Sequence, residues 1–243
     1  MPRFSGVLLL IASGLGLNSA CGQMNYESER QAMVDELRNE SRLTEEYGAP
    51  RISDQTLEVL GRVPRHEFVP DDQKRYAYEN RPLPIGAGQT ISQPYIVALM
   101  TDLAEVTKDD VVLEVGTGSG YQAAVLSELA GHVYTIEIIE MLGQRAKSVL
   151  DRLGYNNVTV RIGDGYAGWP DQAPFDAILV TAAPENIPQP LIEQLAVGGR
   201  MVIPVGAEGE VQVLQVLTKN SDGLLIVKNV IAVRFVPLIR EER

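Results

Sequence analysis

Three glycines alternate with other residues at Gly116, Gly118 and Gly120, directly after a valine-rich apolar run at 111–115. Such a run is typical of a buried strand, and the apolar spacing after Gly120 indicates a helix. A strand, a glycine loop and a helix in this order present a helix N-terminus and closely approaching backbone to a ligand. Loops of this kind bind nucleotides, dinucleotides or S-adenosylmethionine, so the glycines alone leave the ligand open.

Two acidic residues narrow this choice. Glu137 ends the next predicted strand, and Asp164 follows the one after it. Both therefore lie at the carboxyl edge of a parallel sheet, where doubly wound folds bind ligands. There, Glu137 could accept hydrogen bonds from ribose hydroxyls, and Asp164 could accept one from an adenine amino group. The alternative for each is structural: Glu137 caps the following helix, and Asp164 only makes a turn.

Residue types disfavour two of the phosphate-containing ligands. The dinucleotide fingerprint G-x-G-x-x-G needs a third glycine where this chain has Tyr121, because that glycine lets the helix pack closely on the strand. The Gly-Lys-Ser/Thr of a Walker loop does not follow the glycines either. The sequence therefore predicts a nucleoside site that does not hold a pyrophosphate.

The elements that position these residues alternate regularly from residue 111 onward. This alternation predicts an α/β fold with a doubly wound, mostly parallel Rossmann-like sheet. Two further β-rich runs, 211–218 and 224–236, are joined by Asn220-Ser221-Asp222-Gly223 and predict a hairpin that adds an antiparallel C-terminal strand. The core strands are predicted at 111–115, 133–137, 158–162, 175–181 and 200–205, with helices between them.

The residues before the sheet predict an N-terminal helical appendage. Helices are expected at 24–43 and 53–63, a Pro- and Gly-rich loop at 81–93, and a third helix from Pro94. We therefore expect a single domain over 24–243. It would consist of a helical and loop part at 24–105 and a sheet core at 106–243.

Residues 1–23 have the three parts of a secretory signal: Arg3, a short apolar core at 7–12, and small residues before Cys21. The end of the segment is similar to a bacterial lipoprotein signal, except that Asn18 stands where that pattern has leucine. The alternative is a disordered extension with no targeting role. Both interpretations leave this segment outside the fold.

Composition argues against several classes of site. The net charge of −11 and a pI near 4.7 argue against a nucleic-acid enzyme, which needs a phosphate-neutralising surface. The one cysteine, Cys21, excludes an internal disulfide and a cysteine-based metal site. The two histidines, His66 and His132, lie far apart, so no metal cluster is expected. We expect both histidines and Trp169 to be structural.

Several short segments occur in the order found in one family. Together they resemble the protein-L-isoaspartate(D-aspartate) O-methyltransferase family over roughly residues 57–238. The resemblance implies methyl transfer from S-adenosyl-L-methionine to the α-carboxyl group of L-isoaspartyl residues in damaged proteins, giving an ester that cyclises to a succinimide. The segments are VPRH (63–66), GQTISQPY (88–95), LEVGTGSGYQAA (113–124), VRIGDG (160–165), FDAI (175–178), TAAP (181–184) and RFVPL (234–238).

The resemblance also assigns site residues. It implies that Ser92 is the active-site residue, whose hydroxyl could donate to the acceptor carboxylate. A carboxylate is already ionised at neutral pH, so neither a general base nor a metal is expected. The alternative for Ser92 is structural, as the N-cap of the helix that starts at Pro94. The implied substrate loop includes Thr90, Ile91, Gln93 and Pro94, and the implied cofactor-binding residues are Glu114, Gly116, Thr117, Gly118, Ser119, Gly120, Glu137, Asp164 and Gly165.

The expected partners are isoaspartyl-containing proteins and peptides, with no nucleic acid, and with membrane contact only if Cys21 is lipidated. An extended peptide is expected to lie across residues 88–95 and the C-terminal strand near Val236. One departure from the family is Ile239, where many members have threonine.

We expect a cytoplasmic protein, because the methyl donor is made and kept in the cytosol, the lipoprotein pattern is imperfect at Asn18, and the chain resembles this family. We also expect a monomer. The signal-like N-terminus supports the alternative of a periplasmic or lipid-anchored protein. Two other functions stay open at this point: a small-molecule carboxyl methyltransferase and an exported, non-catalytic binding protein.

Overall fold

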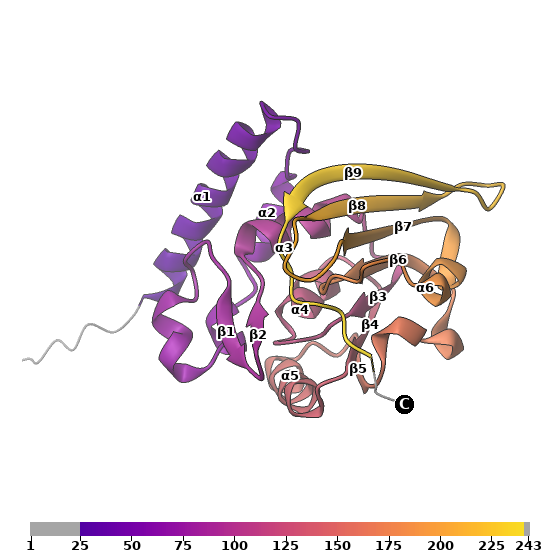
Figure 1. The fold of residues 1–243 in the computed structure, drawn as a ribbon. Coiled ribbons are helices and arrows are strands. Elements are labelled where there is room, and N and C mark those ends of the chain that lie inside the picture. Colours follow the sequence, from indigo (N-terminus) through magenta and orange to yellow (C-terminus); the bar gives the residue numbers. More distant parts are fainter. Residues whose placement is uncertain (1–24, 241–243) are drawn as a thin grey trace, which may run out of the picture.

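The computed structural model describes residues 25–240, which are built around a seven-stranded sheet (Figure 1). The strand order is β5-β4-β3-β6-β7-β8-β9. The first five strands in this order run parallel, whereas β8 is antiparallel to both of its neighbours. The predicted α/β class, with a mostly parallel sheet and an antiparallel C-terminal strand, is confirmed. The strands are β3 (Val111–Val115), β4 (His132–Glu137), β5 (Val158–Ile162), β6 (Phe175–Val180), β7 (Leu195–Val205), β8 (Gln212–Lys219) and β9 (Leu225–Val233).

Alternate residues of the central strands face opposite sides of the sheet. In β3, Val112 belongs to one buried cluster, and its neighbour Leu113 belongs to another. In β6, Leu179 and Ile178 divide between the same two clusters. This period of two, with both faces apolar, is what a parallel sheet covered on both sides requires. The connecting helices are α4 (Tyr121–Ser127), α5 (Glu140–Leu153) and α6 (Gln189–Gln194), with 3-10 turns at Gly165–Ala167 and Pro170–Gln172.

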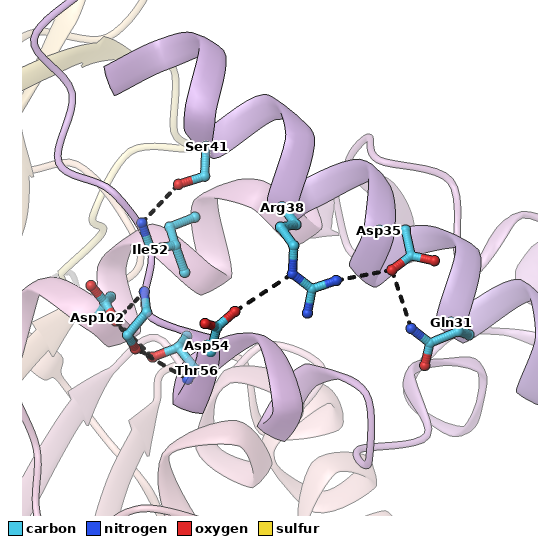
Figure 2. Close-up of polar contacts among 9 residues, drawn as sticks. Gln31, Asp35, Arg38, Ser41, Ile52, Asp54, Thr56 and Asp102 are labelled. Atoms are coloured by element: carbon cyan, nitrogen blue, oxygen red, sulfur yellow. Dashed lines mark hydrogen bonds and ion pairs between the residues drawn. The ribbon is translucent and has the colours of Figure 1, made fainter. Parts of the chain in front are cut away.

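The N-terminal part adds three helices, of which α1 lies at one end of the molecule (Figure 1). They are α1 (Tyr26–Glu45), α2 (Asp54–Leu60) and α3 (Pro94–Leu103), with 3-10 turns at Arg65–Phe68 and Asp71–Tyr76. Figure 2 shows polar contacts that join them. Asp102 of α3 accepts hydrogen bonds from the Ser53 backbone and hydroxyl and from the Thr56 hydroxyl, at 3.1, 2.5 and 2.9 Å. Arg38 of α1 contacts Asp54 of α2 at 3.5 Å. The appendage is therefore tied to the far end of α3.

The segment at 81–93, expected to be a loop, contains a two-stranded antiparallel ribbon of β1 (Leu83–Gly86) and β2 (Gln89–Ile91). Its turn, Gly86-Ala87-Gly88, has φ values of 99°, 50° and 71°, a left-handed run that the two glycines make possible. The prolines concealed the strand, because proline removes a backbone donor and usually marks a loop. Pro84 is tolerated because this ribbon has only two strands, and both are edges.

The observed start of β7 differs from the predicted one. β7 begins at Leu195, five residues before the predicted start at residue 200. Gly198 and Gly199 lie within the strand, where its register with β6 shifts. Among residues 25–240, no helix is long and apolar enough to cross a membrane. The signal-like segment 1–23 lies outside the described residues.

Candidate active site

The glycine loop is fixed to the neighbouring strand ends by its own backbone. The N–H groups of Gly116 and Thr117 both donate to the Ile136 carbonyl of β4, at 2.8 and 3.1 Å. On the other side, the Thr181 hydroxyl donates to the Gly116 carbonyl at 2.5 Å. Gly116 has φ +99°, and a Cβ there would collide with that hydroxyl, so only glycine fits. The loop is thus held from both neighbouring strands.

Glu137, at the end of β4, is held in the cleft by backbone donors. Its Oε2 accepts from the Gly118 N–H at 2.7 Å, and its Oε1 accepts from the Ile139 N–H at 2.9 Å. Ile139 is the N-cap residue of α5, and no side chain caps the first turn of this helix, so Glu137 does not cap α5 as the structural alternative predicted. Each carboxylate oxygen has a further lone pair, so these contacts leave Glu137 able to accept ligand hydroxyls. Glu137 is therefore fixed by two backbone donors, and its role toward a ligand stays a prediction.

Asp164 caps a short 3-10 turn through its Oδ1, which accepts from the Tyr166 N–H at 2.8 Å. This contact agrees with the turn-forming interpretation and uses one of the two oxygens. Its neighbour Gly165 lines the same cleft as Glu137, and Asp164 comes directly before it. The role of Asp164 toward a ligand stays a prediction.

Glu114, inside β3, is a fully buried carboxyl with one oxygen unpaired. Its Oε2 accepts from the Thr135 hydroxyl at 2.5 Å, while Oε1 has no hydrogen-bond partner. Burial raises the pKa of the Glu114 carboxyl to about 8; the Thr135 bond opposes this rise and the nearby Glu137 charge adds to it. A buried carboxyl with an unpaired oxygen needs an explanation, and a ligand that donates to it supplies one.

Three hollows meet around residues 90–94, the Ser92 loop. The glycine-loop cleft, about 520 Å³, lies between the glycine loop, Glu137, and the Pro237–Ile239 tail. The inner cavity behind it is bordered by Glu114 and Ser119. The outer groove, about 1420 Å³, runs along the end of β9 and the residues after it, at Ala232–Val236. Thr90 borders all three hollows, and Ser92 borders the inner cavity and the outer groove.

Ser92 does not cap α3, so the structural interpretation of this residue is wrong. Gln93 occupies the N-cap position and makes no side-chain cap bond. The first turn is capped instead by Asn80, whose Oδ1 accepts from the Tyr95 N–H at 3.0 Å. The Ser92 carbonyl accepts from Arg65 at 2.7 Å, whereas its hydroxyl has no hydrogen-bond partner within residues 25–240.

Arg65 is the residue of this site that the sequence reasoning missed. Its side chain is fully buried and donates from Nε to the Ala77 carbonyl at 2.8 Å and from Nη2 to the Ser92 carbonyl. Its guanidinium lies 4.8 Å from the ring centroid of Tyr121. Burial lowers the pKa of Arg65 to about 10, so it stays charged at neutral pH. The VPRH segment contributed to the resemblance, but its spacing contains no signal that this arginine is buried.

Tyr121 also explains why the third glycine is absent. It is buried at the first turn of α4, and its ring meets Phe68 edge-on, with the ring centroids 5.7 Å apart. The bulky side chain therefore packs the glycine-loop helix against the segment that carries Arg65. A glycine here would leave a void in that contact.

The remaining candidates have structural contacts. His66 shares a hydrogen bond with the Tyr78 hydroxyl at 2.7 Å, rather than with backbone, and His132 shares one with Thr159 at 2.9 Å. Trp169 packs beside the second buried cluster. In the described part of the chain, no group of three or more His, Cys, Asp or Glu residues could hold a metal ion.

Comparisons with known proteins agree with this geometry. The family model described as protein-L-isoaspartate(D-aspartate) O-methyltransferase matches residues 28–243. A protein-L-isoaspartate O-methyltransferase 2 of Polaromonas sp. is 60% identical over 210 residues, which are 86% of this chain and 97% of that protein. One of Syntrophobacter fumaroxidans with the same name is 52% identical over 233 residues, which are 96% and 94% of the two chains.

Solved structures give the same result. A protein-L-isoaspartate O-methyltransferase matches with a TM-score of 0.74 and 30% identity, over 86% of this chain and 65% of that one. A Plasmodium falciparum structure, described as a putative enzyme of this kind in complex with S-adenosyl-L-homocysteine, has a TM-score of 0.72. It covers 90% of this chain and 100% of that one, and at 22% identity it supports the fold alone.

Proposed function

The chain belongs to the protein-L-isoaspartate(D-aspartate) O-methyltransferase family, and from this we propose that it is a protein-repair methyltransferase. It transfers a methyl group from S-adenosyl-L-methionine to the free α-carboxyl group of L-isoaspartyl residues in damaged proteins and peptides. The resulting ester cyclises to a succinimide, and hydrolysis returns part of it to normal aspartyl. The observation that carries the proposal is Ser92, whose unpaired hydroxyl borders both the inner cavity and the outer groove.

The glycine-loop cleft fits the methyl donor. The cleft combines apolar side chains, such as Ile138 and Leu238, with the polar groups of Glu137 and the glycine loop, which is the mixture typical of small-molecule sites. Glu137 would accept the ribose hydroxyls, Asp164 the adenine amino group, and the unpaired Oε1 of Glu114 the ammonium of the methionine part. S-adenosyl-L-methionine, when bound, supplies a methyl group on a positively charged sulfur.

Ser92 would hold the acceptor. Its hydroxyl donates to the substrate carboxylate, which is ionised at neutral pH and needs no general base. Arg65 donates to the Ser92 carbonyl at 2.7 Å and so restrains the Ser92 backbone, from which the hydroxyl projects. Orientation of the two reactants and exclusion of water then contribute several kcal/mol to the lowering of the barrier.

The outer groove would take an extended peptide beside the Ser92 loop. Most of the side chains that border it are apolar or uncharged, from Pro82 and Ile96 to Phe235. Arg234 is the one ionisable residue among the described residues that border the groove. In a chain with net charge −11, this guanidinium offers local attraction for a substrate carboxylate.

We further propose that the enzyme acts in the cytoplasm as a monomer, as a single domain over 24–243. N-terminal sequencing of the mature protein tests the compartment. A start at or near Met1 supports the proposal, and a lipid-modified start at Cys21 supports the membrane-anchored alternative.

The direct test of the reaction uses labelled S-adenosyl-L-methionine with an isoaspartyl peptide and its normal aspartyl twin. The proposal predicts base-labile methyl ester on the isoaspartyl peptide alone. Equal labelling of both peptides, or labelling of small carboxylic acids with none on either peptide, contradicts it. Binding of the donor without any transfer would support a non-catalytic binding protein instead.

A further inference from the structure

The first turn of α3 is capped by a residue from outside the helix. Tyr95 is the second residue of α3, so its N–H is one of the four that have no acceptor within the helix. The Oδ1 of Asn80, fifteen residues earlier in the chain, accepts from this N–H at 3.0 Å. Asn80 thus provides the contact that an N-cap side chain normally supplies.

The amide of Asn80 is oriented by α1. Its Nδ2 donates to Oε2 of Glu40 at 2.5 Å, while its Oδ1 accepts from Tyr95. Because one end of an amide only donates and the other only accepts, this pair of contacts decides which end faces the helix. Beside it, the Thr44 hydroxyl shares a hydrogen bond with the Tyr95 hydroxyl at 2.8 Å. Side chains of α1 therefore hold the beginning of α3.

This arrangement has a consequence for Ser92. Ser92 lies one residue before the N-cap position, and Gln93 at that position makes no side-chain cap bond, so no side chain of the Ser92 loop caps the first turn of α3. We propose that Asn80, oriented by Glu40, is a positioning residue: it caps α3 in place of the side chains of the Ser92 loop, fixes the start of the helix beside Ser92 and so leaves the Ser92 hydroxyl free for the acceptor carboxylate. The inference rests on the proposed function, and it gives the N-terminal appendage a part in the reaction.

The test compares the two ends of α3. Asn80→Ala should lower kcat on an isoaspartyl peptide by roughly 10- to 100-fold, because a small displacement of the acceptor site is costly. Its affinity for S-adenosyl-L-homocysteine should stay within twofold, since Asn80 does not border the glycine-loop cleft. The matched control is Asp102→Asn, which weakens the three contacts with Ser53 and Thr56 at the other end of the helix (Figure 2). It should lower the melting temperature and leave kcat within threefold.

A charge-swapped pair tests the orientation. Asn80→Asp keeps an acceptor for the Tyr95 N–H but sets a second carboxylate against Glu40, so kcat should fall. Adding Glu40→Gln should restore at least half of the wild-type kcat, because the introduced amide can donate to the introduced carboxylate. A role of Asn80 that does not depend on its contact with Glu40 predicts no such rescue.

Amide hydrogen exchange separates this inference from the proposed function. In Asn80→Ala, the first turn of α3 should exchange faster, and in Asp102→Asn it should not. If the wild type transfers no methyl group, the proposed function fails, and the exchange rates still test the cap. The inference is overturned if Asn80→Ala keeps kcat within twofold, if Asp102→Asn loses as much, or if the double variant is no more active than Asn80→Asp.

Discussion

The glycine-loop cleft and the Ser92 loop border each other, yet different kinds of contact hold them in place. The glycine loop of the cleft is anchored through its own backbone N–H groups: those of Gly116 and Thr117 donate to the Ile136 carbonyl, and that of Gly118 donates to the Glu137 side chain. The Ser92 loop is held by side chains from separate segments, Arg65 and Asn80. A backbone N–H is present whatever the side chain, so its contact survives most substitutions. A side-chain contact is lost with one substitution. The acceptor half of the site is therefore the half that single mutations should disturb most.

The largest effect is expected at Arg65. Arg65→Ala removes two charge-assisted hydrogen bonds and leaves the Ala77 and Ser92 carbonyls unpaired in a buried site. We expect the free energy of unfolding, measured with urea, to fall by about 3–5 kcal/mol. Arg65→Lys should lower the free energy of unfolding by less, since lysine keeps the charge. It should still lower it, because lysine cannot reach both carbonyls in the same geometry.

The matched control is Arg152→Ala. Arg152 is a half-exposed arginine whose side chain contacts Glu67 at 2.8 Å. Exposed ion pairs contribute about 1 kcal/mol or less, so this variant should be close to wild type. If both alanine variants lost the same free energy of unfolding, the Arg65 contacts would contribute no more than an exposed ion pair. The difference drawn between the glycine-loop cleft and the Ser92 loop would then be wrong.

A second effect belongs to the cleft and depends on pH. The pKa of Glu114 is raised to about 8 in the folded protein, above its ordinary value of 4.5. Between these values the folded state keeps a proton that the unfolded state releases, so stability falls as pH rises through this window. Glu114→Gln should remove this decline, with a difference on the order of 2–4 kcal/mol between pH 5 and pH 8.

The measurement is a series of denaturant melts of both proteins across that range. Glu193→Gln, at an exposed position on α6, serves as the control and should keep the wild-type slope. Parallel pH profiles for wild type and Glu114→Gln would contradict the raised pKa of the Glu114 carboxyl, because a carboxyl with the same pKa in both states does not make stability depend on pH.

The smallest effect is expected at the edge of the outer groove. Arg234 is exposed, so its attraction for a peptide carboxylate is screened by water and salt. Arg234→Gln should raise KM for an isoaspartyl peptide about threefold at low salt and leave kcat nearly unchanged. Arg62→Gln, an exposed arginine paired with Glu128 and not on the groove, should leave both constants unchanged. An equal rise in KM for both variants would point to net charge rather than to the groove.

The difference between the glycine-loop cleft and the Ser92 loop also decides what the sequence could predict. The strands at 111–115 and 158–162 were predicted to the residue, because a valine-containing run that ends at a glycine indicates a strand locally, whether the strand is buried like β3 or partly exposed like β5. The carboxyl-edge position of Glu137 followed from the same pattern. The roles of Arg65 and Asn80 could not be predicted, because their partners lie 12 to 40 residues away and the contacts form only when these separate segments pack together.

The ribbon at 83–91 was missed for a related reason. Prolines and glycines indicate a loop when only neighbouring residues are considered, and the pairing of Leu83 with Ile91 depends on the buried environment of both side chains. Long-range packing thus overrides local propensity on the acceptor side of the site.

The most direct test measures both halves of the site in Ser92→Ala and Glu137→Gln. For each variant, kcat on an isoaspartyl peptide and Kd for S-adenosyl-L-homocysteine are determined beside wild type. Separate donor and acceptor halves predict that Ser92→Ala lowers kcat roughly 100-fold with Kd within twofold, whereas Glu137→Gln raises Kd by about 10-fold or more. Unchanged turnover in Ser92→Ala, or a loss of ligand affinity equal to that of Glu137→Gln, would contradict the account.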